Sequence, residues 1–143
     1  MQRLKNKFVL LGICFMLPIW ITAQVKDLPK PIGPYAAYRT EGSLVFVSGQ
    51  IALLADQRLD TSSVEAECRR VMENISQILQ TAGTNWNQVV KATIYTTRLD
   101  WFNRINAVYG EYVKTPYPAR ETVGVCELPK KARIEISVVA RQP

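Results

Sequence analysis

Two residues near the C-terminus, Arg120 and Glu135, have the types and the spacing for chemistry on a small carboxylic acid. They lie at nearly equal distances from a turn centred near Leu128. If the flanking segments pair as a simple hairpin, the two side chains stand opposite each other on one face of the sheet. A guanidinium binds a carboxylate through two parallel hydrogen bonds, and a glutamate can orient water and accept its proton. The alternative is an ordinary cross-strand salt bridge, which contributes little to stability.

The residue types that the sequence lacks exclude several other chemistries. The chain has no histidine, so it has neither a Ser-His nor a Cys-His nucleophile pair. It also lacks a Cys-x-x-Cys motif and a phosphate-binding glycine loop, which argues against a zinc site and a nucleotide site. We therefore predict neither a metal nor a cofactor, and we expect Cys68 and Cys126 to be buried free thiols.

The N-terminus has the layout of a secretory signal peptide. Residues 1–7 carry three basic side chains and no acid, residues 8–21 are almost wholly apolar, and small Ala23 precedes a polar glutamine. The apolar run is shorter than the roughly 20 residues that a membrane-spanning helix needs. We expect residues 1–23 to be removed on export to the periplasm or the medium, with an uncleaved N-terminal anchor as the alternative. Residues 24–143 then form one domain without a membrane attachment.

The charge of the chain depends on whether this leader is counted. The full sequence has 18 basic and 12 acidic residues and a net charge of +6, but three basic residues lie in the leader, which leaves 15 against 12 and a charge of +3. No basic run alternates with aromatic residues. We therefore expect no nucleic-acid partner.

The hydrophobic spacing predicts the secondary structure that must position Arg120 and Glu135. Apolar residues at spacings of three and four from Val64 to Ala82 indicate an amphipathic helix, with Ser62 and Glu65 as a capping box and Gly83 as its end. A second helix is expected after Asp100 as its N-cap, ending before a proline, with an inner face made of Phe102, Ile105, Val108, Tyr109 and Tyr112.

Five strands complete the expected fold. Two form a hairpin around a Glu41-Gly42 turn, and a β-branched run predicts a third. The last two follow the second helix, and the final one alternates apolar and polar residues, so that one of its faces is buried. The order β-β-α-β-α-β-β indicates an α+β domain, a mixed sheet with two helices packed on one face. The predicted strands are 35–39, 44–49, 89–97, 121–126 and 132–140.

Five short motifs, in their order along the chain, resemble those of the RidA (YjgF-like) family of imine deaminases. They are Ile-Gly-Pro-Tyr at 32–35, Val-Ser-Gly-Gln-Ile at 47–51, Tyr-Pro-Ala-Arg at 117–120, Leu-Pro-Lys at 128–130 and Ile-Glu-Ile at 134–136. Each motif is weak evidence by itself, but the five together are strong, and the resemblance covers about residues 27–143. The resemblance implies a chorismate-mutase-like fold and a homotrimer with clefts between subunits.

The resemblance also implies an activity and a set of site residues. The activity is hydrolysis of 2-iminobutanoate or 2-iminopropanoate to the 2-oxo acid and ammonia. Arg120 matches the arginine that binds the substrate carboxylate, and Glu135 matches the carboxylate linked to the reacting water. The remaining pocket positions match Tyr35, Ser48, Asn106 and Thr122. Thr122 stands where several relatives have Cys, Ala or Val, so we expect it to contribute mainly its backbone.

Two other functions stay open at this stage. Export separates the chain from the cytoplasmic reactions that generate most 2-imino acids, which favours a trimeric module that binds small carboxylates, or acts as a chaperone, without turnover. Some members of the family carry the label of endoribonuclease. The absence of histidine removes the commonest acid–base pair for RNA cleavage and makes this the weaker alternative.

Overall fold

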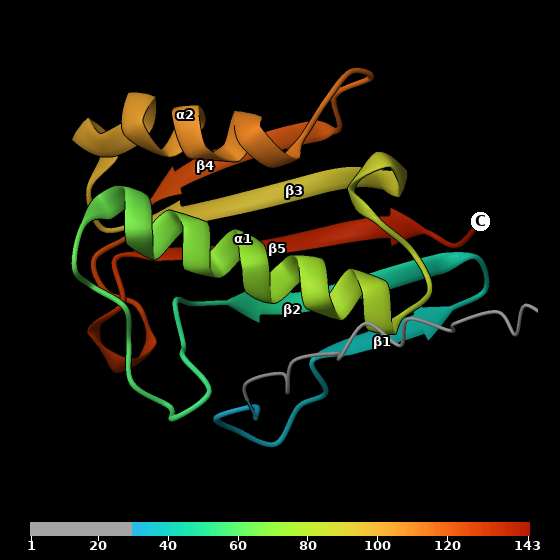
Figure 1. The fold of residues 1–143 in the computed structure, drawn as a ribbon, viewed down its shortest axis with the longest axis horizontal. Helices are drawn as coiled ribbons and strands as arrows, with labels where there is room; N and C mark the ends of the chain where they lie inside the picture. The colour runs from blue at the N-terminus through green and yellow to red at the C-terminus, as the bar shows by residue number, and fades with distance from the viewer. Residues whose placement is uncertain (1–29) are drawn as a thin grey trace, which may run out of the picture.

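The computed structural model describes residues 30–143, so the predicted signal peptide lies outside the described residues. Five strands and two α-helices follow one another in the predicted order β-β-α-β-α-β-β, with three short 3₁₀ helices between them (Figure 1). The main elements are β1 (Tyr38–Glu41), β2 (Leu44–Gln50), α1 (Val64–Thr81), β3 (Val89–Thr96), α2 (Phe102–Tyr112), β4 (Ala119–Gly124) and β5 (Ile134–Arg141), and the 3₁₀ helices are η1 (Trp86–Gln88), η2 (Leu99–Trp101) and η3 (Pro129–Lys131).

The five strands form one mixed sheet in the order β1-β2-β5-β3-β4. Strand β5 runs antiparallel between β2 and β3, while β4 pairs in parallel with β3 at the edge. Both helices cross the same face of this sheet and leave the other face uncovered (Figure 1). The predicted α+β architecture is confirmed, but the predicted hairpin between the last two strands is wrong, because β3 separates β4 from β5.

Helix α1 follows the predicted apolar stripe and begins one residue later than the capping box implied. The N-cap is Ser63, whose hydroxyl accepts a hydrogen bond from the backbone N–H of Ala66 at 3.0 Å. Ser62 instead donates its hydroxyl to Asp60. The helix ends as predicted at Gly83, whose φ of +77° is the left-handed conformation that glycine adopts without strain.

The start of helix α2 also differs from the prediction. Its N-cap is Trp101, with no side-chain cap, and Asp100 lies one residue earlier in η2. The Asp100 carboxylate accepts two hydrogen bonds from the guanidinium of Arg98, which explains why it does not cap the helix. Of the residues expected on the inner face, Ile105, Val108 and Tyr109 are buried, but Phe102 is 42% exposed.

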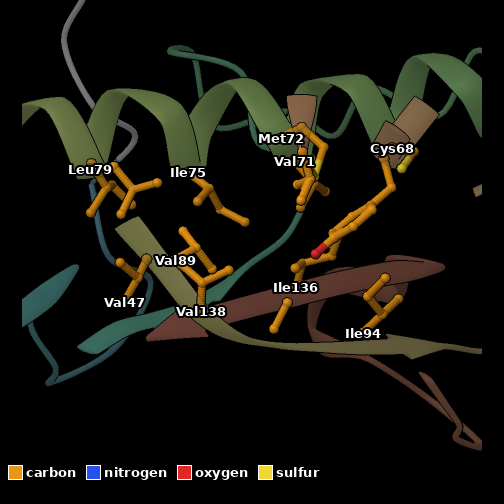
Figure 2. Packing of buried hydrophobic residues seen from close by; sticks show 14 of the residues in the cluster. Val47, Cys68, Val71, Met72, Ile75, Leu79, Val89, Ile94, Ile136 and Val138 are labelled. Atoms are coloured by element: carbon orange, nitrogen blue, oxygen red, sulfur yellow. The ribbon is translucent and has the colours of Figure 1, made fainter. Parts of the chain in front are cut away.

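The core lies between the helices and the covered face of the sheet. Figure 2 shows α1 directing Cys68, Val71 and Ile75 toward Ile136 and Val138 of β5. Alternate residues of β5 are buried, as the strand period of two requires. The covered and uncovered faces are therefore set by the sequence alternation, and the residues between the buried ones point to the open face.

A buried ion pair ties helix α1 to the start of β5. Glu67 is fully buried, and its carboxylate accepts hydrogen bonds from the backbone N–H of Arg133 at 2.7 Å and from Arg133 Nε at 2.6 Å. Arg133 also donates to the carbonyl of Thr61 and lies 5.1 Å from the centre of the Trp101 ring. Both carboxylate oxygens of the buried Glu67 accept hydrogen bonds, as a buried charge requires.

The two cysteines within the described chain are both free, but they differ in exposure. Cys68 is buried as predicted, and burial raises the pKa of its thiol to about 12, so it is unreactive at neutral pH. Cys126 is exposed, which corrects the expectation that both thiols are buried. Between residues 30 and 143, no helix has the length and apolar character that a membrane crossing requires.

Candidate functional site

Arg120 lies on edge strand β4, on the face of the sheet that the helices cover. It pairs across the sheet with Ala92, which is fully buried under the helices. It lines a pocket of about 360 Å³ together with residues of α2 and of the loop that leads into β4. Within residues 30–143, no acidic side chain forms an ion pair with it. The pocket is lined by Asn106, Tyr109, Gly110, Tyr117, Pro118 and Arg120.

Asn106 contributes a second polar group to this pocket from the middle of α2. Its Oδ1 atom is buried and has no hydrogen-bond partner in the described part of the chain. A buried polar atom without a partner costs free energy, so it marks a place where a ligand or water would complete the hydrogen bonding. Arg120 and Asn106 therefore form a polar half-site with unused hydrogen-bonding capacity.

Glu135 lies in a second pocket, of about 300 Å³, on the open face of the sheet. It is paired with Tyr95 across the sheet and alternates with the buried residues of β5. Tyr35 and Ser48 line the same pocket. The Ser48 hydroxyl donates a 2.7 Å hydrogen bond to the carbonyl of Ala36, which fixes the hydroxyl and leaves its oxygen free to accept. The pocket is lined by Ile32, Tyr35, Ser48, Gly49, Ile51, Pro129 and Glu135.

Gly49 allows the Glu135 carboxylate to lie against the backbone of β2. A methyl group added at Gly49 would collide with that carboxylate, so only glycine leaves room for it in this position. Burial raises the pKa of Glu135 above its ordinary value of 4.5. A carboxylate with a raised pKa is a stronger base once it is deprotonated, which suits a group that accepts a proton from water.

The structure does not bring Arg120 and Glu135 together within one chain. Their partners on β3, Ala92 and Tyr95, are three residues apart, so the two side chains point to opposite faces of the sheet. The sequence-based picture of a side-by-side pair on one face is therefore wrong. Instead the chain carries two half-sites, one with Arg120 and Asn106 and one with Glu135, Ser48 and Tyr35.

The sixth predicted site residue, Thr122, follows Arg120 on the same face of β4 and is half-buried. It lines neither of these two pockets. Sequence reasoning missed Gly49 as the residue that makes room for Glu135, although the Val-Ser-Gly-Gln-Ile motif contains it. Among residues 30–143, no group of three or more His, Cys, Asp or Glu side chains is placed to hold a metal ion.

Comparison with known proteins places this arrangement in a family. A family profile described as Endoribonuclease L-PSP matches residues 17–142. A 2-iminobutanoate/2-iminopropanoate deaminase of Dermatophagoides farinae is 37% identical over 112 residues, which cover 78% of this chain and 88% of the relative. A RutC family protein of Pyrococcus abyssi is 41% identical over 113 residues, covering 78% of this chain and 89% of the relative.

Solved structures agree with this assignment. The structure of RidA from the Antarctic bacterium Psychrobacter sp. superposes with a TM-score of 0.76 at 33% identity and covers 79% of this chain and 92% of that one. TdcF of E. coli with bound serine superposes with a TM-score of 0.75, also at 33% identity, and covers 80% of this chain and 93% of that one. The chain belongs to the RidA (YjgF) family, which includes reactive intermediate deaminases.

Proposed function

We propose that this protein hydrolyses reactive 2-imino acids of the 2-iminobutanoate and 2-iminopropanoate type to 2-oxo acids and ammonia. The observation that carries the proposal is an arginine that has no acidic partner among residues 30–143 in one half-site and a carboxylate with a raised pKa in the other. The relative from Dermatophagoides farinae bears the name of this activity and supports the same substrate class.

In this proposal, Arg120 anchors the substrate. Its guanidinium binds the carboxylate of the imino acid through two parallel hydrogen bonds, which fix both the position and the angle of the reacting carbon. Asn106 supplies a further polar contact in the same pocket. A lysine would supply the charge without the fork, so the geometry of arginine matters as much as its charge.

Glu135 then acts on water. Its carboxylate takes one proton as the water oxygen bonds to the imine carbon, which breaks the C=N π bond and gives a carbinolamine. The protonated Glu135 passes that proton to the amine nitrogen. The C–N bond breaks, ammonia leaves, and the hydroxyl oxygen forms the carbonyl as its proton passes to the ammonia. The net reaction converts a protonated imine and water into a 2-oxo acid and an ammonium ion, with no covalent intermediate on the protein.

A complete site in this proposal needs two chains, because one chain holds Arg120 and Glu135 on opposite faces. The open face of the sheet exposes Phe46 and Val123, which are 43% and 39% exposed and which another copy would cover. We propose a homotrimer in which the Arg120 half-site of one subunit meets the Glu135 half-site of its neighbour.

Subunit complementation tests this arrangement together with the activity. Arg120→Ala and Glu135→Gln should each abolish ammonia release from imines generated in situ. An equal mixture, unfolded and refolded together, should recover about a quarter of the wild-type activity, since one site in four pairs an intact arginine with an intact glutamate across an interface. No recovery would contradict the shared site, while wild-type activity in either single variant would contradict the assigned roles.

The same proteins separate the proposal from its alternatives. Binding of a 2-oxo acid that depends on Arg120, without ammonia release from imines, would favour a binding module. The family profile is described as an endoribonuclease, so RNA should be incubated with wild type and Arg120→Ala in parallel. RNA cleavage that Arg120→Ala retains would point to another site or to a contaminant.

Export remains part of the proposal. We propose that residues 1–23 direct the chain out of the cytoplasm and are then removed. Expression of the full chain, followed by fractionation and N-terminal sequencing, tests this. A mature N-terminus at Gln24 in the exported fraction is the expected result, and a full-length chain in the cytoplasm would contradict it.

A further inference from the structure

The guanidinium of Arg120 lies against two aromatic rings of helix α2. Its Cζ atom is 4.9 Å from the centre of the Tyr109 ring and 5.8 Å from the centre of the Phe102 ring. The two rings are seven residues apart, which places them on one face of the helix, two turns apart. Both distances fall within the range of about 6 Å in which a cation is attracted to the face of a ring.

These rings replace the acid that usually holds an arginine in place. A carboxylate partner would neutralise the guanidinium and occupy some of its N–H donors, as Glu67 does for the Nε–H of Arg133. Attraction to a ring needs no hydrogen bond, so the N–H donors of Arg120 stay available for a ligand. Arg120 takes part in none of the ion pairs formed by residues 30–143.

The two rings differ in how firmly they are held. Tyr109 is 6% exposed and belongs to the core cluster, so its position is fixed by packing. Phe102 is 42% exposed, so packing restrains its ring less. The hydroxyl of Tyr109 is buried and has no hydrogen-bond partner in the part of the chain that the structure describes. The aromatic ring, rather than the hydroxyl, is therefore the group that Tyr109 presents to Arg120.

We propose that Tyr109 and Phe102 are positioning residues, which hold the Arg120 guanidinium in place for a small carboxylate without neutralising it. The identity of that carboxylate as a 2-imino acid rests on the proposed function, whereas the aromatic contact itself does not. Once the substrate is bound, its two hydrogen bonds to Arg120 still fix the reacting carbon, so loss of one ring mainly weakens substrate binding and changes the chemical step little. The expected kinetic signature is a raised KM with a nearly constant kcat.

The test compares ring-retaining and ring-removing variants in the full protein, with 2-oxobutanoate as the ligand in calorimetry. Tyr109→Leu and Phe102→Leu should each raise the Kd by about three- to thirtyfold, the range expected for loss of a cation–π contact. Tyr109→Phe keeps the ring and should bind as wild type does. Tyr112→Leu is the matched control, because Tyr112 lies on the same helix, packs against Trp86 and lines no part of the Arg120 pocket.

The Nε–H resonance of Arg120 in a ¹⁵N-labelled protein provides a readout that needs no ligand. Ring currents should shift it in wild type and Tyr109→Phe, and the shift should diminish in Phe102→Leu, a half-exposed position that tolerates substitution. The proposal is overturned if both leucine variants keep the wild-type Kd and resonance, or if Tyr109→Phe behaves like Tyr109→Leu. If the wild-type resonance is shifted but the protein turns over no imine, the aromatic contact is supported and only the proposed function is contradicted.

Discussion

Two arginines of this protein, Arg133 and Arg120, both lie against aromatic rings, and they differ in whether a carboxylate holds them. Arg133 lies 5.1 Å from Trp101 and is paired with fully buried Glu67. Arg120 lies 4.9 Å from Tyr109 and has no acidic partner within residues 30–143. Hydrogen-bond donors already used inside the protein stabilise the fold, whereas donors left free can bind a ligand.

Replacing each arginine by methionine should separate these two roles most strongly. Arg133→Met leaves the Glu67 charge buried without its partner and should lower the free energy of unfolding by about 3–5 kcal/mol. Arg120→Met removes no ion pair and should change it by less than about 0.5 kcal/mol, while it abolishes turnover. Urea unfolding at a matched protein concentration measures both values. Equal losses of stability would remove the distinction between the two arginines.

Glu67→Gln tests the same pair from the other side and should cost less than Arg133→Met. The glutamine oxygen still accepts the backbone N–H of Arg133, and the Arg133 side chain is 31% exposed, so water can solvate its charge. We expect a loss of about 1–3 kcal/mol in the free energy of unfolding. A loss larger than that of Arg133→Met would show that the carboxylate has a role beyond pairing.

Gly49→Ala tests how tightly the Glu135 half-site is built. The added methyl collides with the Glu135 carboxylate, so kcat should fall by about tenfold or more through displacement of the base. Glu135→Asp shortens the side chain and should reduce this penalty when the two changes are combined. Steady-state ammonia release from the two single variants and the double variant measures the coupling. Additive losses would mean that the methyl acts elsewhere.

The smallest expected effect concerns pH and the charge of Glu135. Because burial raises its pKa above 4.5, turnover that needs the deprotonated form should fall as the pH drops through that raised pKa. The native state binds this proton more tightly than the unfolded chain does, so the associated stability is present below about pH 4.5 and is lost as the pH rises.

Glu135→Gln is a neutral replacement that checks this sign. It should abolish turnover, yet raise the thermal midpoint slightly at pH 7, with the difference shrinking as the pH falls. Differential scanning calorimetry of both proteins between pH 7 and about pH 4.5 measures the difference in thermal midpoint. A lower midpoint at pH 7 would mean that the ionised carboxylate stabilises the native state.

The sequence predicted what depends on local order and failed where distant segments meet. The apolar spacing from Val64 to Ala82 and the alternation in β5 are local properties, so the helix and the buried face of the strand were predicted correctly. The choice between Ser62 and Ser63 as the N-cap depends on the hydrogen bond from Ser62 to Asp60, which leaves Ser63 to cap the helix. The pairing of β4 with β3 joins segments on either side of α2, and no short-range pattern distinguishes it from a hairpin with β5.

The candidate site was predictable as a set of residues but not as a geometry. The resemblance to the family named six residues, of which five line one of two pockets, while Thr122 lines neither; the five are Arg120, Asn106, Glu135, Ser48 and Tyr35. Their division between opposite faces follows from the strand order, which the hairpin interpretation had wrong. The sequence also did not predict the aromatic contacts of Arg120, because Phe102 and Tyr109 fit the apolar face expected of any amphipathic helix.

Because the two half-sites lie on opposite faces of the sheet, one inactive subunit would affect the active sites of its neighbours in the proposed trimer. A chain that lacks both Arg120 and Glu135 would still fold and assemble, and in the proposed trimer it would spoil both clefts that it borders. When such a chain is produced together with the normal one, it should be dominant negative, because it inactivates sites that normal subunits share with it. Dilution that dissociates the proposed trimer should lower the activity per chain, because a monomer would have no complete active site. Activity per chain would then rise with protein concentration.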